Sequence, residues 1–129
     1  MTNSDGDSKE VVQRLVDAAN ARDWDALLGV CAPDVTLIHP LVAVPYRGEA
    51  GIREFFVTSS EALPDQQLHL DVLLTNGEVA ALEGRITATE DDEPIVTPCA
   101  FFFTFRDRLV HQIRMYYDTA TIGEYEDLA

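Results

Sequence analysis

The segment QLHLDVLLTNGEVAALEGRITAT, residues 67–89, decides the fold class of this chain. Two runs rich in apolar and β-branched residues flank the sequence TNGE. The Asn76-Gly77 pair within it is the strongest short-range signal for a tight β-hairpin turn. The segment therefore predicts two antiparallel strands, over residues 67–74 and 78–89.

Two further strands follow toward the C-terminus. EDDEP, residues 90–94, is rich in residues that end strands, and the β-type run IVTPCAFFFTF follows at 95–105. The charged triplet RDR, residues 106–108, predicts a turn before LVHQIRMYY at 109–117. We therefore expect four consecutive antiparallel strands.

Toward the N-terminus, apolar residues recur with helical spacing. Asp7 and Glu10 form a capping-box-like helix start, and an apolar face continues to about Ala21. Asp23 is placed to cap a second, shorter helix, WDALLGVCA at 24–32, which the next proline ends.

One strand and one helix separate these elements from the hairpin. DVTLIHP, residues 34–40, is a short β-type run. EAGIREFFVTSSEAL, residues 49–63, has an apolar helical stripe that ends before Pro64. This order predicts an α+β fold in which three N-terminal helices pack on a curved sheet.

Length and composition indicate one globular domain. The chain has 129 residues and 47% hydrophobic content, enough for one core. We expect a disordered tail at 1–7, a domain at 8–122 and an acidic tail at 123–129. Cys31 and Cys99 lie in apolar elements without CxxC spacing, which favours buried free thiols.

Charge and motifs limit the partners. The net charge of −14 would repel nucleic acid and anionic membrane surfaces. No run approaches the ~20 apolar residues of a membrane span, and the acidic N-terminus is unlike a signal peptide, so we expect a cytoplasmic protein. His39, His69 and His111 lack the spacing of metal ligands, and no glycine-rich phosphate loop occurs. We expect neither a metal nor a cofactor.

Three segments carry a family resemblance: VVQRLVDAANARDWDALLGVCAPDVTLIHP, YRGEAGIREFF and LVHQIRMYYD. In these the chain resembles the nuclear transport factor 2-like superfamily, in its ketosteroid isomerase and SnoaL-like polyketide cyclase branch. The resemblance implies a cone-shaped α+β barrel with a mixed or antiparallel sheet around an apolar pocket. It also implies a homodimer formed through the open face of the sheet, for which the apolar face of AALEGRI is a candidate.

His39 occupies the position of the family's general base, just before a proline at the end of the first strand. The family's oxyanion-hole tyrosine falls at Leu15, its supporting tyrosine at Phe56 and its protonated aspartic acid at about Phe101. Losing one oxyanion donor costs roughly 10²–10³ in rate, so steroid isomerisation itself is not implied. These apolar replacements are instead candidate substrate-binding residues. For His39 the alternative is a histidine satisfied by a backbone group at the strand end.

Glu83 and Arg85 lie on one face of the second hairpin strand. Simple alternation along the strand leaves the two charges in solvent, whereas the resemblance places them in the pocket. An arginine and an aspartate of related epoxide hydrolases correspond to positions near these two residues. In the pocket they would orient a water or a substrate carbonyl.

Ile113, Met115 and Tyr117 share one face of the last strand, either as core or as the apolar wall of a pocket with the Tyr117 hydroxyl as a donor. Met115 is near the position of the epoxide hydrolases' catalytic aspartate. Asp118, which follows, would orient His39 or cap the sheet.

Three functions are compatible with these features. The first is a cofactor-independent acid–base enzyme, of isomerase, cyclase or hydrolase/dehydratase type, acting on a lipophilic carbonyl compound of steroid or polyketide type, with His39 as the base. The second is a non-catalytic domain that binds such a molecule, and the third is an interaction dimer with a vestigial pocket.

Overall fold

The computed structural model describes residues 4–118. Its helices and strands, in chain order, are α1 (Ser4–Ala21), α2 (Trp24–Gly29), β1 (Cys31–Ile38), β2 (Tyr46–Arg47), α3 (Gly48–Ala62), β3 (Gln67–Thr75), β4 (Val79–Glu90), β5 (Glu93–Arg106) and β6 (Leu109–Tyr117).

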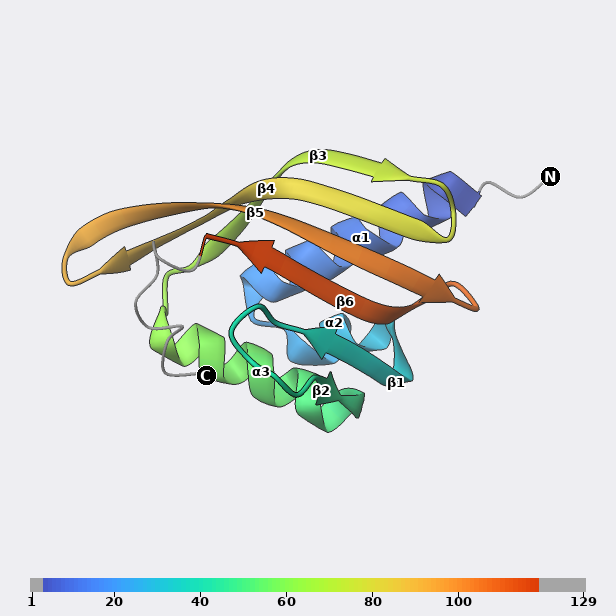
Figure 1. Ribbon diagram of the computed structural model, residues 1–129, viewed down its shortest axis with the longest axis horizontal. Coiled ribbons are helices and arrows are strands. Elements are labelled where there is room, and N and C mark those ends of the chain that lie inside the picture. The colour runs from blue at the N-terminus through green and yellow to red at the C-terminus, as the bar shows by residue number, and fades with distance from the viewer. Residues whose placement is uncertain (1–3, 119–129) are drawn as a thin grey trace.

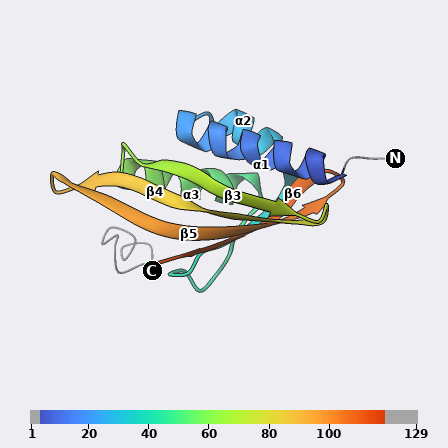
Figure 2. The ribbon, with the colours of Figure 1, turned by 90° about the horizontal axis from the view of Figure 1, so that it is seen from above.

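The strands form one six-stranded mixed sheet in the order β2-β1-β6-β5-β4-β3. Strands β1 and β6 pair in parallel, and the other neighbours pair antiparallel. The three helices lie on one side of the sheet, which curves around them (Figures 1 and 2). The predicted α+β fold with helices packed on a curved mixed sheet is confirmed.

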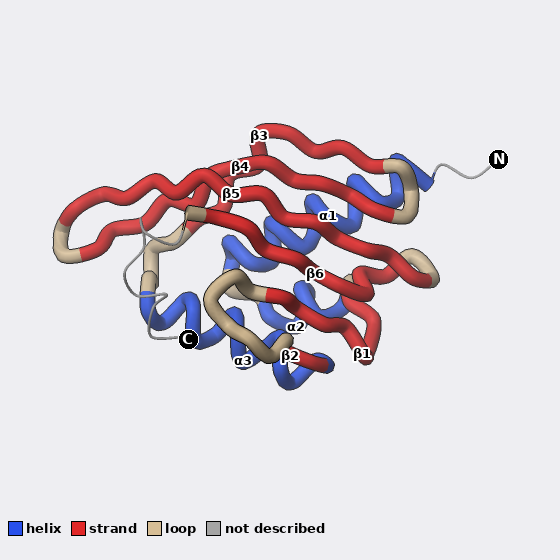
Figure 3. The backbone as a smooth tube through the Cα atoms, viewed as in Figure 1, coloured by secondary structure: helices blue, strands red, loops and turns tan. Residues whose placement is uncertain are grey.

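The hairpin that decides the fold class forms as expected. Asn76 Oδ1 accepts hydrogen bonds from the backbone N–H groups of Glu78 and Val79, at 3.0 and 2.9 Å, and Gly77 supplies the positive φ of 93°. The next turn joins β4 to β5 in a long hairpin that extends beyond α3 (Figure 3). The predicted limits of β6 are also those of the structure.

The core fills the space between the helices and the sheet. Residues of β4 alternate, so Leu82 and Ile86 are buried against the helices while Glu83 and Arg85 are exposed on the other face. The fully buried core includes Val12, Leu27, Leu37, Ile52, Phe103 and Ile113.

Strand β3 carries a bulge between Leu70 and Val72, which leaves Asp71 as the extra residue opposite β4. Gly84 lies across from Leu70 at this point. A Cβ atom on Gly84 would lie 2.1 Å from the backbone oxygen of His69, so the two backbones approach closely because residue 84 has no side chain.

Several elements differ from the sequence prediction in their limits, β1 and β5 by two or three residues at their starts. Helix α1 begins at Ser4, within the expected tail, and its first half is anchored by Ser8, whose hydroxyl donates to the oxygen of Gly77 at 3.0 Å. Helix α2 ends at Gly29, because Cys31 already pairs with Val110 of β6. The two-residue strand β2 was not expected. Residues 1–3, 119–122 and the predicted acidic tail lie outside the described residues.

No helix in the described part of the chain combines the length and the apolar character needed to cross a membrane.

Candidate functional site

A cavity opens between the C-terminal end of α1, helix α3 and the inner face of the sheet. Its space amounts to about 520 Å³ including the open mouth, of which about 60 Å³ is wide enough to hold the centre of a water molecule. The cavity is therefore a narrow slot, because little of this space is wide enough for a water molecule.

Aromatic side chains form much of the wall. Phe55 and Phe56 enter from α3, with ring centroids 5.1 Å apart, and Trp24 at the start of α2 stacks on Phe56 at 6.0 Å. Phe101 of β5 and Met115 of β6 face them from the sheet. A slot with aromatic walls favours a flat, apolar ligand.

Tyr117 is the polar residue that the described part of the sheet contributes to the cavity. Its hydroxyl is hydrogen-bonded to Nε2 of His39, the residue directly after β1. The parallel pairing of β1 with β6, with Ile38 opposite Arg114, brings these two positions together. His39 is 2% exposed and does not line the cavity, because its ring lies against Phe55 and Tyr117 with centroids 5.3 Å from each.

The surroundings of His39 fix its charge and tautomer. Burial lowers the pKa of His39 from 6.5 to about 4, so the ring is neutral at neutral pH. Its Nδ1 accepts a hydrogen bond from the backbone N–H of Leu41 at 3.1 Å. Because Nδ1 is the acceptor, the single proton of the neutral ring is on Nε2. His39 Nε2–H therefore donates to Tyr117 Oη, and the tyrosine's own hydroxyl proton points away from His39.

Polar side chains at the mouth are held by backbone groups. Arg22, between α1 and α2, has a φ of 60°, and its guanidinium donates to the oxygens of Ala19 at 3.1 Å and of Pro64 and Gln66 at 2.8 Å. Gln66 Nε2 donates to the backbone oxygen and hydroxyl of Ser59, at 3.0 and 2.9 Å. These bonds tie the end of α1 to the connection between α3 and β3.

Residues 12–113 match the family model described as the SnoaL-like domain. The chain belongs to the SnoaL-like domain family. This match includes most of the residues that line the cavity, whereas Met115 and Tyr117 lie just beyond its end.

Solved structures agree with this SnoaL-like fold. A protein assigned to the SnoaL-like polyketide cyclases of Jannaschia sp. CCS1 superposes with a TM-score of 0.85 at 19% identity, over 95% of this chain and 93% of that one. TerC, co-crystallised with polyporic acid, gives 0.83 at 20% identity, over 94% and 98%. Bal32a, from a soil-derived mobile gene cassette, gives 0.85 at 19% identity, over 95% and 98%. At these identities the superpositions concern the fold alone.

The predicted substrate-binding residues divide into two groups in this SnoaL-like domain. Phe56, Phe101 and Met115 line the cavity, as does Tyr117. Leu15 and Ile113 lie in the core outside the cavity, 4% and 0% exposed.

Of the two positions left open for Glu83 and Arg85, the structure has the exposed one and not the pocket that the resemblance implied. Both lie on the outer face of the SnoaL-like sheet, where Arg85 Nε donates to Asp71 at 3.0 Å. Simple strand alternation gives this arrangement, since Leu82, Gly84 and Ile86 take the inner face. Asp118 is exposed after the end of β6 and is not among the residues that line the cavity.

Neither cysteine is suited to act as a nucleophile. Both are buried and free, and burial is the main cause that raises the pKa of Cys31 to about 12 and of Cys99 to about 11. Within residues 4–118, no group of His, Cys, Asp and Glu side chains is arranged to hold a metal ion.

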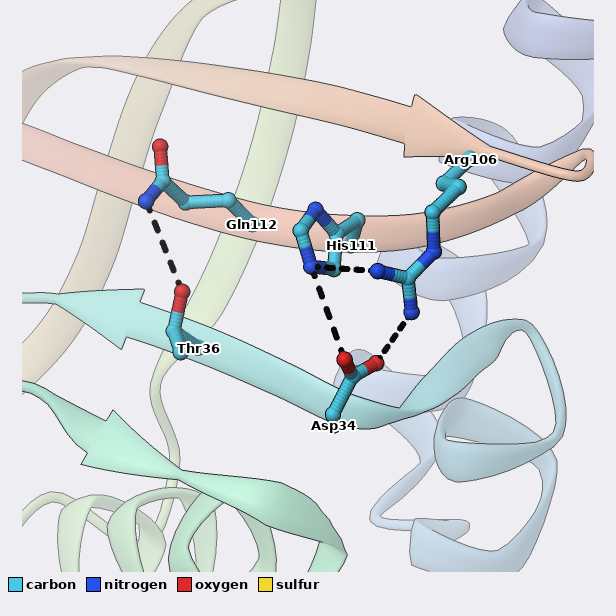
Figure 4. A network of polar contacts seen from close by, with 5 residues as sticks. All are labelled: Asp34, Thr36, Arg106, His111 and Gln112. Carbon is cyan, nitrogen blue, oxygen red and sulfur yellow. Dashed lines mark hydrogen bonds and ion pairs between the residues drawn. The ribbon is translucent and has the colours of Figure 1, made fainter.

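His111 takes part in a polar network away from the cavity (Figure 4). Arg106 Nη2 donates to Asp34 Oδ1 at 2.5 Å, and Arg106 Nη1 lies 3.1 Å from Nε2 of His111. The network links the start of β1 to the β5 and β6 hairpin. The side chains of Asp34, Arg106 and His111 are substantially exposed, so the ion pair between Arg106 and Asp34 adds little to the free energy of unfolding.

Patterns in the sequence did not point to the polar residues that line the cavity. Arg22, Ser59 and Gln66 line the cavity, yet Arg22 meets partners 42 and 44 positions away in the chain. Contacts over such separations leave no local signal in the sequence.

Proposed function

We propose that the cavity binds a flat, lipophilic, carbonyl-bearing molecule of the polyketide type and polarises its carbonyl through Tyr117. The observation that carries this proposal is the hydrogen-bonded pair of Tyr117 and His39 at an otherwise apolar sheet wall. His39 Nε2–H donates to Tyr117 Oη, and the tyrosine O–H donates to the ligand carbonyl. Consecutive hydrogen bonds strengthen one another in a medium of low dielectric constant.

His39 acts in this proposal as a positioning residue. Its Nδ1 is bonded to the Leu41 N–H and its Nε2 carries the proton, so it orients Tyr117 instead of taking a proton from the ligand. If a water molecule takes an α-proton from the ligand, negative charge develops on the carbonyl oxygen, and the donation from Tyr117 strengthens at that stage. Isomerisation and aldol-type cyclisation both pass through such a charge.

A second candidate function is binding without turnover. Among the described residues that line the cavity, none is a carboxylate or a histidine, so a general base is not supplied by the wall. A binding domain needs only the apolar slot and the Tyr117 donor.

Replacing Tyr117 by phenylalanine is expected to weaken binding of a flat aromatic ketone about fivefold, because one hydrogen bond is worth about 1 kcal/mol. Isothermal titration with acetonaphthone would measure this, and polyporic acid, which was co-crystallised with TerC, is a second probe. Tyr116→Phe is the matched control, since Tyr116 is 51% exposed on the other face.

The outcomes separate the two functions. Equal affinity in the wild type and Tyr117→Phe would contradict the proposed carbonyl contact. If the ligand binds through Tyr117, hydrogen–deuterium exchange of the ketone's α-protons distinguishes a catalyst from a binder. A catalyst accelerates this exchange and loses that acceleration in Tyr117→Phe.

We also propose that the protein is a homodimer formed through the outer face of the sheet. This proposal rests on a set of exposed apolar side chains on that face: Val72, Leu74, Val96, Phe102 and Tyr116. The apolar face of AALEGRI packs inside instead. Light scattering of the purified protein should give twice the chain mass, and a monomeric mass would contradict this proposal.

A further inference from the structure

We infer that the cavity selects ligands that carry an anionic group, held at its mouth by Arg22. This inference rests on the proposed function, and it adds the chemical class of the ligand. The ligand would be a flat aromatic molecule with a carbonyl at one end, near Tyr117, and a carboxylate or ionised enol at the other.

The charge inside the cavity is opposite to that of the protein. Of the described residues that line it, Arg22 alone carries a formal charge at neutral pH. The whole chain has 23 acidic and 9 basic residues, so the surface elsewhere repels anions. A cation at the mouth of an apolar slot is therefore a local feature that favours an anion over a neutral molecule of the same shape.

The Arg22 side chain is also preorganised. Its three hydrogen bonds to backbone oxygens use one N–H of Nη1 and both of Nη2. A guanidinium has five N–H donors, and within residues 4–118 no hydrogen bond uses Nε–H or the second N–H of Nη1, which we assign to the ligand. Because the protein already holds the guanidinium in place, an anion would bind it with little loss of side-chain entropy.

Within residues 4–118, no carboxylate lies within ion-pair distance of Arg22. Asp65 is the acidic residue that interacts with it at longer range. The pKa of Asp65 lies below its usual value, first because the Thr89 side chain and backbone N–H donate to it and, to a smaller degree, because Arg22 is nearby. Asp65 thus competes weakly with a bound anion.

The test uses two ligands of the same shape. Acetylnaphthoate carries a ketone and a carboxylate at opposite ends of a flat ring system, and its primary amide is neutral. The wild type should bind the carboxylate about fivefold more tightly than the amide, because a charge-assisted hydrogen bond is roughly twice as strong as a neutral one. Arg22→Gln should abolish this preference, and Arg22→Lys should retain part of it.

Two further measurements keep the test independent of folding. Asp65→Asn should increase the preference for the carboxylate. Added salt should reduce this preference in the wild type. Both measurements can be made even if Arg22→Gln does not fold. Equal affinities for both ligands in the wild type, or an equal loss for both in folded Arg22→Gln, would overturn the inference.

The Tyr117→Phe variant separates this inference from the proposed function. The substitution should lower the affinity for both ligands to the same degree, because both carry the ketone. If that loss occurs without any preference for the carboxylate, the proposed function stands and the role of Arg22 is wrong. If neither ligand binds the wild type, the proposed function fails and the inference fails with it.

Discussion

Replacing Gly84 by alanine is expected to lower the free energy of unfolding by about 3 kcal/mol, the upper part of the usual range for a forced steric insertion. The added Cβ would lie 2.1 Å from the His69 backbone oxygen. A backbone atom in a paired strand cannot move aside like a flexible side chain, so β3 and β4 would separate at the bulge beside Asp71. Urea unfolding followed by circular dichroism measures the loss.

Gly29→Ala is the matched control for this substitution. An added Cβ there meets no atom within 4 Å, and residue 29 ends α2. Alanine should leave the stability unchanged or raise it slightly, since glycine is the poorer helix former. A Gly84→Ala protein as stable as Gly29→Ala would show that the two strands are not in the register described above.

Acidification is expected to destabilise the protein through His39. The pKa of His39 is about 4 in the folded state because of burial, against 6.5 ordinarily, so the unfolded chain takes up the proton first. Stability attributable to this residue is complete above pH 6.5 and is lost as the pH falls toward 4. The difference between these two pKa values corresponds to a loss of about 3 kcal/mol in the free energy of unfolding at pH 4.

The comparison of wild type with His39→Phe isolates this contribution, because the acidic residues titrate in both proteins. The difference between their unfolding free energies should shift by about 3 kcal/mol between neutral pH and pH 4, to the disadvantage of the wild type. Nitrogen NMR of the imidazole provides a direct check. A His39 that becomes charged near its ordinary pKa would contradict the buried, neutral ring.

Local signals in the sequence were sufficient for most of the fold. The Asn76-Gly77 turn and the alternation along β4 depend on neighbouring residues, and both appear in the structure as expected. The end of α2 was misplaced because residues after Gly29 pair with β6, some 80 positions further along the chain. Such long-range pairing overrides local helix preference.

The candidate site was less accessible from sequence for the same reason. His39 was recognised as unusual, but its relation to Tyr117 depends on the parallel pairing of β1 and β6. For Glu83 and Arg85 the sequence left two positions open, and the structure has the exposed one that simple alternation gives. Arg22 was missed because its partners lie on a distant connection between α3 and β3.

Infrared difference spectroscopy of a bound ketone tests most directly whether Tyr117 donates to the ligand carbonyl. With acetonaphthone labelled at its carbonyl carbon, the C=O stretch should lie at lower frequency in the wild type than in Tyr117→Phe, because a hydrogen bond weakens the carbonyl bond. Tyr116→Phe should match the wild type. The same carbonyl frequency in the wild type and Tyr117→Phe, with ligand bound to both, would contradict the proposed role of the Tyr117 and His39 pair.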